Sequence, residues 1–170
     1  MGKMQILTIL RELSFLQDVD EEHLEKLAEI AQLATYEESE VVFRDGDSAE
    51  SIYFVVSGGV SLEICAPSIG CRRILTMGPG ELVGWSAVLG QSRLTATARA
   101  MNATCLVQVH AGLLRTLCDH DPVFGYEIMR RTALALAKRL SATRVQLLDV
   151  YGGDDSLQFE MNSNGDDDAH

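Results

Sequence analysis

Short apolar runs separated by glycine-containing turns occupy the middle of the sequence, and they restrict the folds that the chain can adopt. The runs are residues 41–43, 52–56, 60–64, 73–76, 95–100 and 105–109. Asp45-Gly46-Asp47 and Ser57-Gly58-Gly59 supply turn chemistry between the first of them. Runs of this length and composition are typical of β-strands. Apolar residues at helical spacing precede and follow this region. We therefore predict a mainly β protein with flanking α-helices, an antiparallel β-roll of the double-stranded β-helix or jelly-roll type.

Two helices are predicted before the strands, because apolar residues recur there every three or four positions. They are Leu7, Leu10 and Leu13 in the first helix, and Leu24, Leu27, Ile30 and Ala31 in the second. Asp18 or Asp20 can cap the second helix. Glu21 and Glu22 lie in its first turn, where negative charge interacts favourably with the helix dipole.

A long C-terminal helix is predicted over residues 122–150. Asp121 suits its N-cap, Pro122 its first position, and Gly152-Gly153 its end. One apolar seam alternates spacings of four and three along it: Met129, Ala133, Leu136, Leu140, Thr143, Leu147 and Val150. A helix of about 42 Å is too long for a small roll to cover. We therefore expect a homodimer through residues 122–150; the alternative is that the seam packs against the roll of its own chain.

Net charge and composition limit the class of protein. The 170 residues carry a net charge of −11, and six acidic residues without one Lys or Arg fall in the last 17. This acidity argues against direct DNA binding. We expect one domain over residues 1–150 and a disordered acidic tail over 151–170. No apolar run reaches the about 20 residues of a membrane helix, and no signal peptide is recognisable, so we expect no membrane association and a cytoplasmic location.

The cysteines and histidines do not form a recognisable reactive set. No CxxC joins Cys65, Cys71, Cys105 and Cys118, and we expect small buried thiols. A bridge between Cys65 and Cys71 across one hairpin is geometrically conceivable, but a cytoplasmic setting argues against it. The four histidines lack HxH or HExxH spacing. We expect no metal, no cofactor and no catalytic residues.

Several segments resemble, in order and spacing, those of cyclic nucleotide-binding domains. They are Phe43-Arg44-Asp45-Gly46-Asp47, Ile52-Tyr53-Phe54-Val55-Val56-Ser57-Gly58, Gly80-Glu81-Leu82 and the segment that closes on Thr95-Ala96. The resemblance covers about residues 10–150. This region is similar to the sensor half of bacterial catabolite-activator and FNR-type regulators, without their helix-turn-helix. It implies a cyclic nucleotide such as cAMP or cGMP as the ligand.

The resemblance also implies which residues bind that ligand. Those before the long helix are Gly80, Glu81, Leu82, Gly84, Trp85, Arg93, Thr95 and Ala96. Glu81 would accept the ribose 2′-hydroxyl, and Thr95 would donate to a phosphate oxygen. Residues 84–88 are expected to form a short helical turn whose N–H groups face the phosphate.

One position departs from the family pattern. The family places an arginine directly before the residue that matches Thr95, whereas Leu94 occupies that position and Arg93 lies one residue earlier. In a strand, a shift of one residue turns a side chain to the opposite face. Arg93 therefore points away from the phosphate unless a bulge re-aims it.

Two residues of the long helix complete the predicted site. Thr143 is the polar residue of the seam, and by resemblance it falls where the helix of the family contacts the purine, with Arg139 one turn earlier. The alternative is that the Thr143 hydroxyl bonds a local backbone carbonyl.

Three functions are compatible with the sequence. The first is a regulatory module that binds a cyclic nucleotide and signals through its dimer helix to an unknown protein partner. The second is a binding-degenerate homologue that serves dimerisation or scaffolding, an interpretation that Leu94 supports. The third, a cupin-like enzyme, is disfavoured because no catalytic set is recognisable.

Overall fold

The computed structural model describes residues 2–162, with side chains as far as residue 152. The chain divides between Thr132 and Ala133 into two compact units. The first unit contains all the strands of the described residues, and the second contains the remainder of the last helix. Each unit is described by itself.

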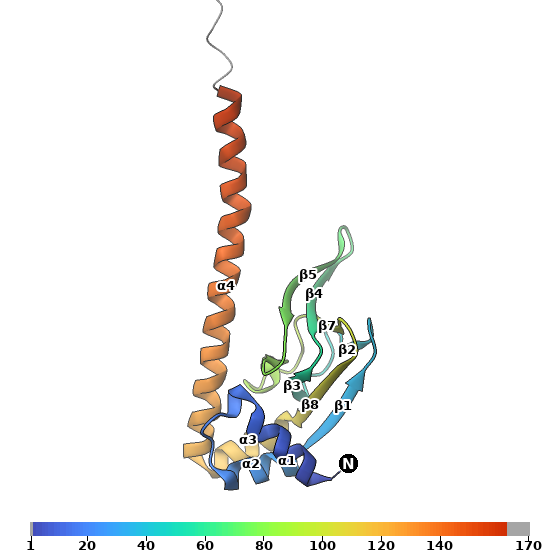
Figure 1. Ribbon diagram of the computed structural model, residues 1–170, viewed down its shortest axis with the longest axis vertical. Helices are drawn as coiled ribbons and strands as arrows, with labels where there is room; N and C mark the ends of the chain where they lie inside the picture. Colours follow the sequence, from blue (N-terminus) through green and yellow to red (C-terminus); the bar gives the residue numbers. More distant parts are fainter. Residues whose placement is uncertain (1, 163–170) are drawn as a thin grey trace, which may run out of the picture. The chain divides into compact units, whose positions relative to one another are not determined.

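The β-roll consists of two four-stranded antiparallel sheets, which confirms the predicted fold class (Figure 1). One sheet has the order β1-β8-β3-β6 and the other β2-β7-β4-β5. The strands are β1 (Ala31–Tyr36), β2 (Val41–Phe43), β3 (Ser51–Ser57), β4 (Val60–Ala66), β5 (Gly70–Met77), β6 (Leu82–Val83), β7 (Thr97–Ala100) and β8 (Thr104–His110). All six predicted runs form strands, although β7 starts two residues later than predicted. β1 and β6 were not predicted.

The two N-terminal helices are present near their predicted positions. They are α1 (Lys3–Glu12) and α2 (Glu21–Glu29), joined through the 3₁₀ turn η1 (Ser14–Leu16). Asp20 lies at the N-cap of α2 but makes no capping bond with its side chain. Ala31, expected in the second helix, instead begins β1.

β3 separates two hydrophobic clusters, because its side chains alternate between the two faces of the sheet. Ile52 and Phe54 pack with the leucines of the N-terminal helices. Tyr53 and Val55 point the other way, into a cluster enclosed by the two sheets. Other members of this inner cluster are Phe43, Val60, Leu62, Met77, Val83, Leu94, Ala98 and Leu106. The inner cluster fills the space between the two sheets.

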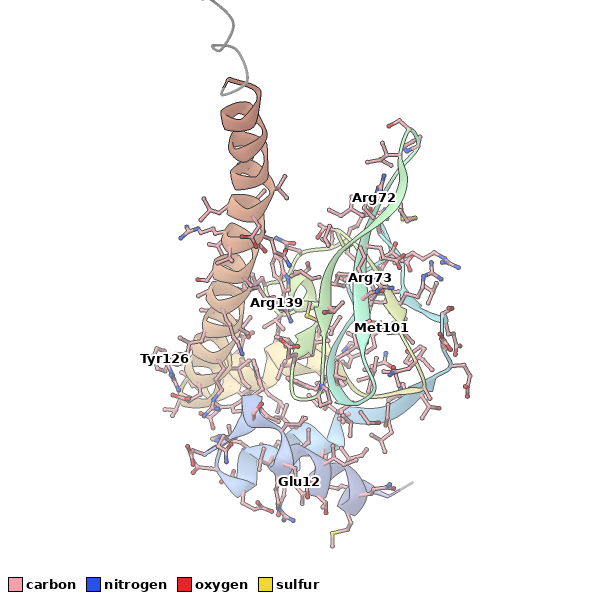
Figure 2. The ribbon with its side chains drawn as sticks, turned by 45° about the horizontal axis from the view of Figure 1, so that its top comes forward. Glu12, Arg72, Arg73, Met101, Tyr126 and Arg139 are labelled. Atoms are coloured by element: carbon pink, nitrogen blue, oxygen red, sulfur yellow. A yellow bond between two sulfur atoms is a disulfide. The ribbon has the colours of Figure 1, made fainter. Side chains whose placement is uncertain are left out.

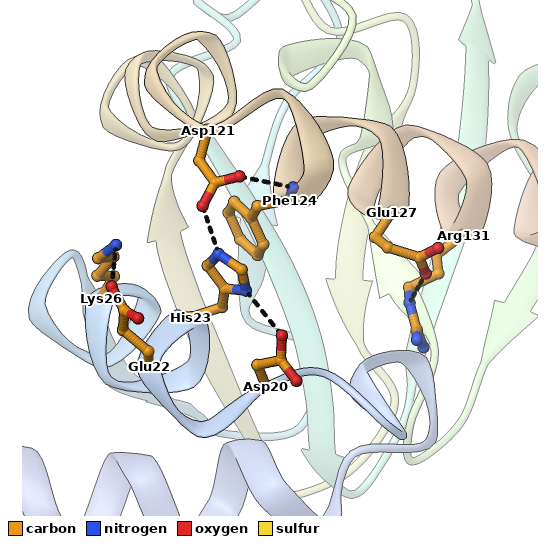
Figure 3. Close-up of polar contacts among 8 residues, drawn as sticks. All are labelled: Asp20, Glu22, His23, Lys26, Asp121, Phe124, Glu127 and Arg131. Atoms are coloured by element: carbon orange, nitrogen blue, oxygen red, sulfur yellow. Dashed lines mark hydrogen bonds and ion pairs between the residues drawn. The ribbon is translucent and has the colours of Figure 1, made fainter.

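A contact between α2 and the start of the last helix, α4, fixes one end of the first unit (Figure 3). Asp121 Oδ1 accepts a hydrogen bond from Phe124 N at 3.1 Å, which confirms Asp121 as the N-cap of α4. Asp121 Oδ2 lies 2.6 Å from His23 Nε2. The His23 ring stacks on Phe124, with the ring centroids 4.6 Å apart. Nearby, Arg131 Nη1 donates to the carbonyl oxygen of Phe15 at 2.8 Å.

Two helices follow the roll. α3 (Ala111–His120) was not predicted; it begins directly at the end of β8. α4 runs over Pro122–Asn162, past the end predicted near Gly152-Gly153. Glycine in a helix costs about 1 kcal/mol relative to alanine, but unlike proline it retains the N–H donor. α4 therefore includes residues 151–162 of the predicted tail. The division into a domain over 1–150 and a disordered tail over 151–170 stays a prediction, and residues 163–170 lie outside the described part. Within the described residues, no helix combines the length and apolar character needed to cross a bilayer.

The cysteines differ from expectation at one pair. Cys65 on β4 and Cys71 on β5 are direct partners in the hairpin register and form a disulfide. Both residues are exposed. The expectation of four buried thiols is therefore wrong for this pair, because strand pairing places the two side chains opposite each other on one face. Cys105 and Cys118 are free thiols of intermediate exposure.

Candidate ligand site in the roll

A 3₁₀ turn after β6 forms the rim of the candidate site. The turn, η2, spans Trp85–Ala87 and confirms the prediction of a helical segment within residues 84–88. Gly84 precedes it with φ of 79°, a left-handed conformation that glycine adopts without strain. A Cβ at Gly84 would also lie 3.3 Å from the carbonyl oxygen of Ser51. Gly84 therefore lets the chain turn sharply from β6 into η2 close to β3.

A small hollow lies next to this turn. Its volume is about 30 Å³, far below the about 300–1,000 Å³ of pockets that hold small-molecule ligands. It is lined by Phe43, Leu62, Gly84, Trp85, Ser86, Leu94, Thr95 and Ala96. None of these eight residues carries a charge, and the side-chain polar groups among them are those of Ser86 and Thr95, together with the Trp85 indole. The predicted residues Gly84, Trp85, Thr95 and Ala96 are thus brought together.

The segment Gly80-Glu81-Leu82 does not line the hollow. Glu81 Oε2 accepts a hydrogen bond from Gly78 N at 2.7 Å, so the carboxylate closes the turn that leads into β6. Gly80 N donates to the carbonyl oxygen of Val55 at 2.8 Å. Leu82 is buried in the cluster shared with the N-terminal helices. The structure does not bring Gly80, Glu81 or Leu82 to the hollow.

Gly80 lines a different hollow of about 240 Å³. The other residues lining it are Ile9, Glu12, Leu13, Ser14, Val56 and Pro79. A Cβ at Gly80 would lie 2.7 Å from Ser14 Oγ, and φ at Gly80 is 85°. Gly80 therefore permits close approach of the loop to the N-terminal helices.

Leu94 and Arg93 point to opposite sides of the loop. Leu94 is 6% exposed and belongs to the inner cluster with Phe43 and Leu62. Arg93 is exposed, and its Nη1 donates to the carbonyl oxygen of Gly46 at 2.7 Å. The apolar side chain thus lies inside the roll, at the sequence position that the resemblance gives to an arginine, while the cation faces the neighbouring turn.

Arg99, the next arginine along the chain, is held by structural contacts. Its Nε lies 3.3 Å from Glu63 Oε2, and its Nη1 donates to the carbonyl oxygen of Ser39 at 2.9 Å. It is not among the residues lining the hollow. Arg99 therefore does not replace the arginine missing at Leu94.

The interior next to the hollow is uncharged. The Tyr53 ring packs against Phe43, with centroids 5.7 Å apart. Burial raises the pKa of Tyr53 to about 12, so its phenol stays neutral. Phe43, Leu62 and Ser86 were not predicted as site residues. Phe43 and Leu62 lie in predicted strands, but only the pairing of β2, β7 and β4 brings them beside Thr95.

The helix residues of the predicted site belong to the second unit. Thr143 Oγ1 donates to the carbonyl oxygen of Arg139 at 2.9 Å, which is the local bond that the sequence left open as an alternative. Their contact with a ligand stays a prediction.

The β-roll with a short helical turn beside a hollow defines a regulatory ligand-binding domain of the cyclic nucleotide type. The model of the cyclic nucleotide-binding domain family matches residues 33–121, more than half of the chain. The chain belongs to this family.

Relatives with known names are similar over parts of their length. A cyclic nucleotide-gated potassium channel of Mesorhizobium japonicum is 31% identical over 94 residues, which are 55% of this chain and 24% of the channel. The CRP-like cAMP-activated global transcriptional regulator of Mycobacterium tuberculosis is 25% identical over 143 residues, which are 84% of this chain and 62% of the regulator. In both cases the chain covers less than two thirds of the relative.

Solved structures share the fold. The crystal structure of a cyclic nucleotide-binding domain from Methylobacillus flagellatus has a TM-score of 0.72 at 19% identity, and the alignment covers 86% of this chain and 83% of that one. Fold and family are therefore those of regulatory cyclic nucleotide-binding domains.

Proposed function

We propose that this chain is a regulatory module that senses a cyclic nucleotide such as cAMP or cGMP, and that it is not an enzyme. The observation that carries the proposal is the hollow that gathers Gly84, Trp85, Thr95 and Ala96 at the start of η2. The ligand state passes through a dimer of the helix over residues 122–150 to a protein partner in the cytoplasm. Direct recognition of duplex DNA is not part of this function, because the chain is acidic.

Backbone and hydroxyl donors would hold the cyclic phosphate. The first N–H groups of a helical turn have no partner within that turn, and the exposed Thr95 adds a hydroxyl at the edge of the hollow. No side-chain cation is among the lining residues. A charge-assisted hydrogen bond is worth about 1.5–3 kcal/mol, so we expect binding about 10- to 150-fold weaker than in relatives that retain the arginine.

Calorimetric titration with cAMP, cGMP and cyclic dinucleotides tests the proposal. Thr95→Val removes the hydroxyl at nearly constant shape and should abolish or strongly weaken binding, whereas Thr95→Ser keeps the donor and should retain it. Glu81→Gln tests the ribose contact that the resemblance implies. Tight binding that survives both Thr95→Val and Glu81→Gln would place the ligand site elsewhere.

A second candidate is a binding-degenerate domain that serves dimerisation or scaffolding. Two observations favour it: the hollow is only about 30 Å³, and Leu94 is buried in the inner cluster. Under this interpretation the titrations give no heat with any nucleotide, while the chain still self-associates. Nucleotide binding at any affinity that Thr95→Val weakens would exclude it.

The potential metal ligands of the described residues do not support a cupin-like enzyme. Such a site would need clustered metal ligands. Within the described residues, the one group of three potential ligands is Glu63, Cys65 and Cys71, and its two cysteines are joined in a disulfide.

A further inference from the structure

The tip of the β4–β5 hairpin carries a pair of sulphur atoms that the proposed ligand function does not use. Cys65 and Cys71 are directly paired across the hairpin, six residues apart in sequence, and form a disulfide. Both residues are exposed. A disulfide can be attacked only where a thiolate reaches one of its sulphur atoms, and this pair is accessible.

The hairpin does not depend on this disulfide for its pairing. Strand pairing between β4 and β5 extends from the disulfide back to Val60 and Met77 at the base. A crosslink that closes a short loop removes less entropy from the unfolded chain than one that closes a long loop. We therefore expect the strands to stay paired when the disulfide opens.

Positive charge lies beside the pair. Arg72 and Arg73 directly follow Cys71 on β5 and are exposed (Figure 2). Glu63, the nearest carboxylate, faces Arg73 across the strands and is paired with Arg99 at 3.3 Å. A carboxylate oxygen of Glu63 lies within 4.8 Å of both sulphur atoms, so one negative charge and the positive charges of Arg72, Arg73 and Arg99 surround the pair. These four charges add up to +2, although the chain as a whole carries −11.

The remaining cysteines are poorly reactive. Burial raises the pKa of Cys105. Burial, together with the nearby carboxylates of Asp119 and Asp121, raises the pKa of Cys118 to about 11. Since the thiolate is the reactive form, these raised pKa values lower the reactivity of Cys105 and Cys118 at neutral pH.

We propose that Cys65 and Cys71 form a thiol–disulfide exchange site for anionic low-molecular-weight thiols. A thiolate attacks one sulphur, the Cys65–Cys71 bond breaks, and a mixed disulfide and one cysteine thiolate result. A second thiolate attacks the mixed disulfide on the sulphur of the small molecule and releases the second cysteine. Two thiols are oxidised to one small disulfide, and their two protons pass to Cys65 and Cys71. This proposal does not depend on nucleotide binding, and a reversible disulfide is the kind that a cytoplasmic protein would carry.

The exchange site is tested by titrating the native chain with mixtures of reduced and oxidised glutathione. Samples are quenched in acid, alkylated under denaturing conditions and mapped by peptide mass spectrometry. We expect Cys65 and Cys71 to change together and reversibly, with a midpoint within the range of the buffers. In native alkylation without glutathione, Cys105 and Cys118 should label slowly. Cys105→Ser is the matched control and should leave the midpoint unchanged.

Two variants test the mechanism. Cys65→Ser should trap Cys71 as a stable mixed disulfide with glutathione, because no resolving thiol remains. Arg72→Glu combined with Arg73→Glu should slow reduction by glutathione roughly tenfold at low ionic strength, but not reduction by neutral 2-mercaptoethanol. The proposal is overturned if both cysteines are free thiols in the oxidised buffer, if the disulfide persists in excess reduced glutathione under native conditions, or if the double variant reacts with glutathione at the original rate.

Discussion

Arg93 Nη1 donates a hydrogen bond to the carbonyl oxygen of Gly46 at 2.7 Å. Backbone bonds hold the loop in the same register: Leu94 N donates to Asp47 O, and Gly46 N donates to Leu94 O, both at 2.9 Å. The loop before β7 is therefore fixed to the turn after β2, with the cation outside and the leucine inside. No bulge re-aims Arg93 in this structure, so its side chain points away from the inner cluster that contains Leu94.

Replacing the outward cation should leave ligand binding almost unchanged. We expect Arg93→Ala to alter the Kd for cAMP or cGMP by less than about twofold, because the guanidinium is exposed and engaged by Gly46. Calorimetric titration measures this, with Thr95→Val as the variant that should lose affinity. An Arg93→Ala loss as large as that of Thr95→Val would mean that the loop rearranges when the ligand binds.

Replacing the inward leucine should have the opposite effect on affinity. Leu94→Arg restores the guanidinium at the family position, and we expect a gain of about 10- to 150-fold in affinity for cyclic nucleotides. Since Leu94 is buried, the same change should lower the free energy of unfolding of the free protein by about 2–5 kcal/mol. Leu94→Met is the matched control, with little change in either quantity. Leu94→Arg protein that is folded but binds no better than wild type would contradict this account of the missing arginine.

The strands were predictable from the sequence wherever glycine turns isolate them. β3 is the clearest example, since its residues alternate between two buried faces. β1 was missed because Ile30 and Ala31 continue the helical spacing of α2 without a glycine or proline between them. α3 was missed for a similar reason, because Ala111 follows β8 without a linker. Tertiary packing sets these boundaries, and the local sequence preferences of the residues do not predict them.

Only the site residues that lie in one continuous segment of the chain were predictable from the sequence. The sequence indicates the turn at Gly84 and the position of Thr95, because both lie in one continuous segment. The lining by Phe43 and Leu62 depends on cross-strand pairing with β7. The direction of the Glu81 carboxylate depends on a bond to Gly78 N, which the family resemblance does not reveal.

The seam of α4 offers a direct test of the proposed dimer. Within the single chain, the seam residues Leu140, Leu147 and Val150 are 53%, 52% and 70% exposed. We expect a wild-type dimer at micromolar concentrations and a monomer after Leu136→Glu with Leu140→Glu, because like charges would oppose each other across the seam. Analytical ultracentrifugation distinguishes the two states.

The matched control places the same charges off the seam. Ala137→Glu with Ser141→Glu changes two exposed residues of the same helix stretch and should leave the dimer intact. A wild type that sediments as a monomer, or a seam variant that sediments like the control, would contradict dimerisation through residues 122–150.

Acid should weaken the connection between α2 and α4 through Asp121. The hydrogen bond with His23, and next the bond from Phe124 N, lower the pKa of Asp121. A lowered carboxyl pKa stabilises the fold at pH values above the ordinary value near 4, and this stabilisation is lost as the pH falls through the folded-state pKa. Asp121→Asn keeps the capping oxygen but loses the charge. We expect a Tm lower than wild type by roughly 2–5 °C at pH 7, and a difference that shrinks as the pH falls from 5 to 3.

Circular dichroism melts of both proteins across this pH range measure the effect. Asp20→Asn is the control, because Asp20 lies 3.9 Å from His23 Nδ1 and makes no capping bond (Figure 3). It should follow the wild-type curve. Parallel curves for Asp121→Asn and wild type between pH 5 and 3 would show that the Asp121 charge does not stabilise the junction. Convergence of the two curves at low pH would mean that protonation of Asp121 causes part of the acid sensitivity of the domain. The Asp121 carboxylate both caps α4 and bonds to His23 of α2.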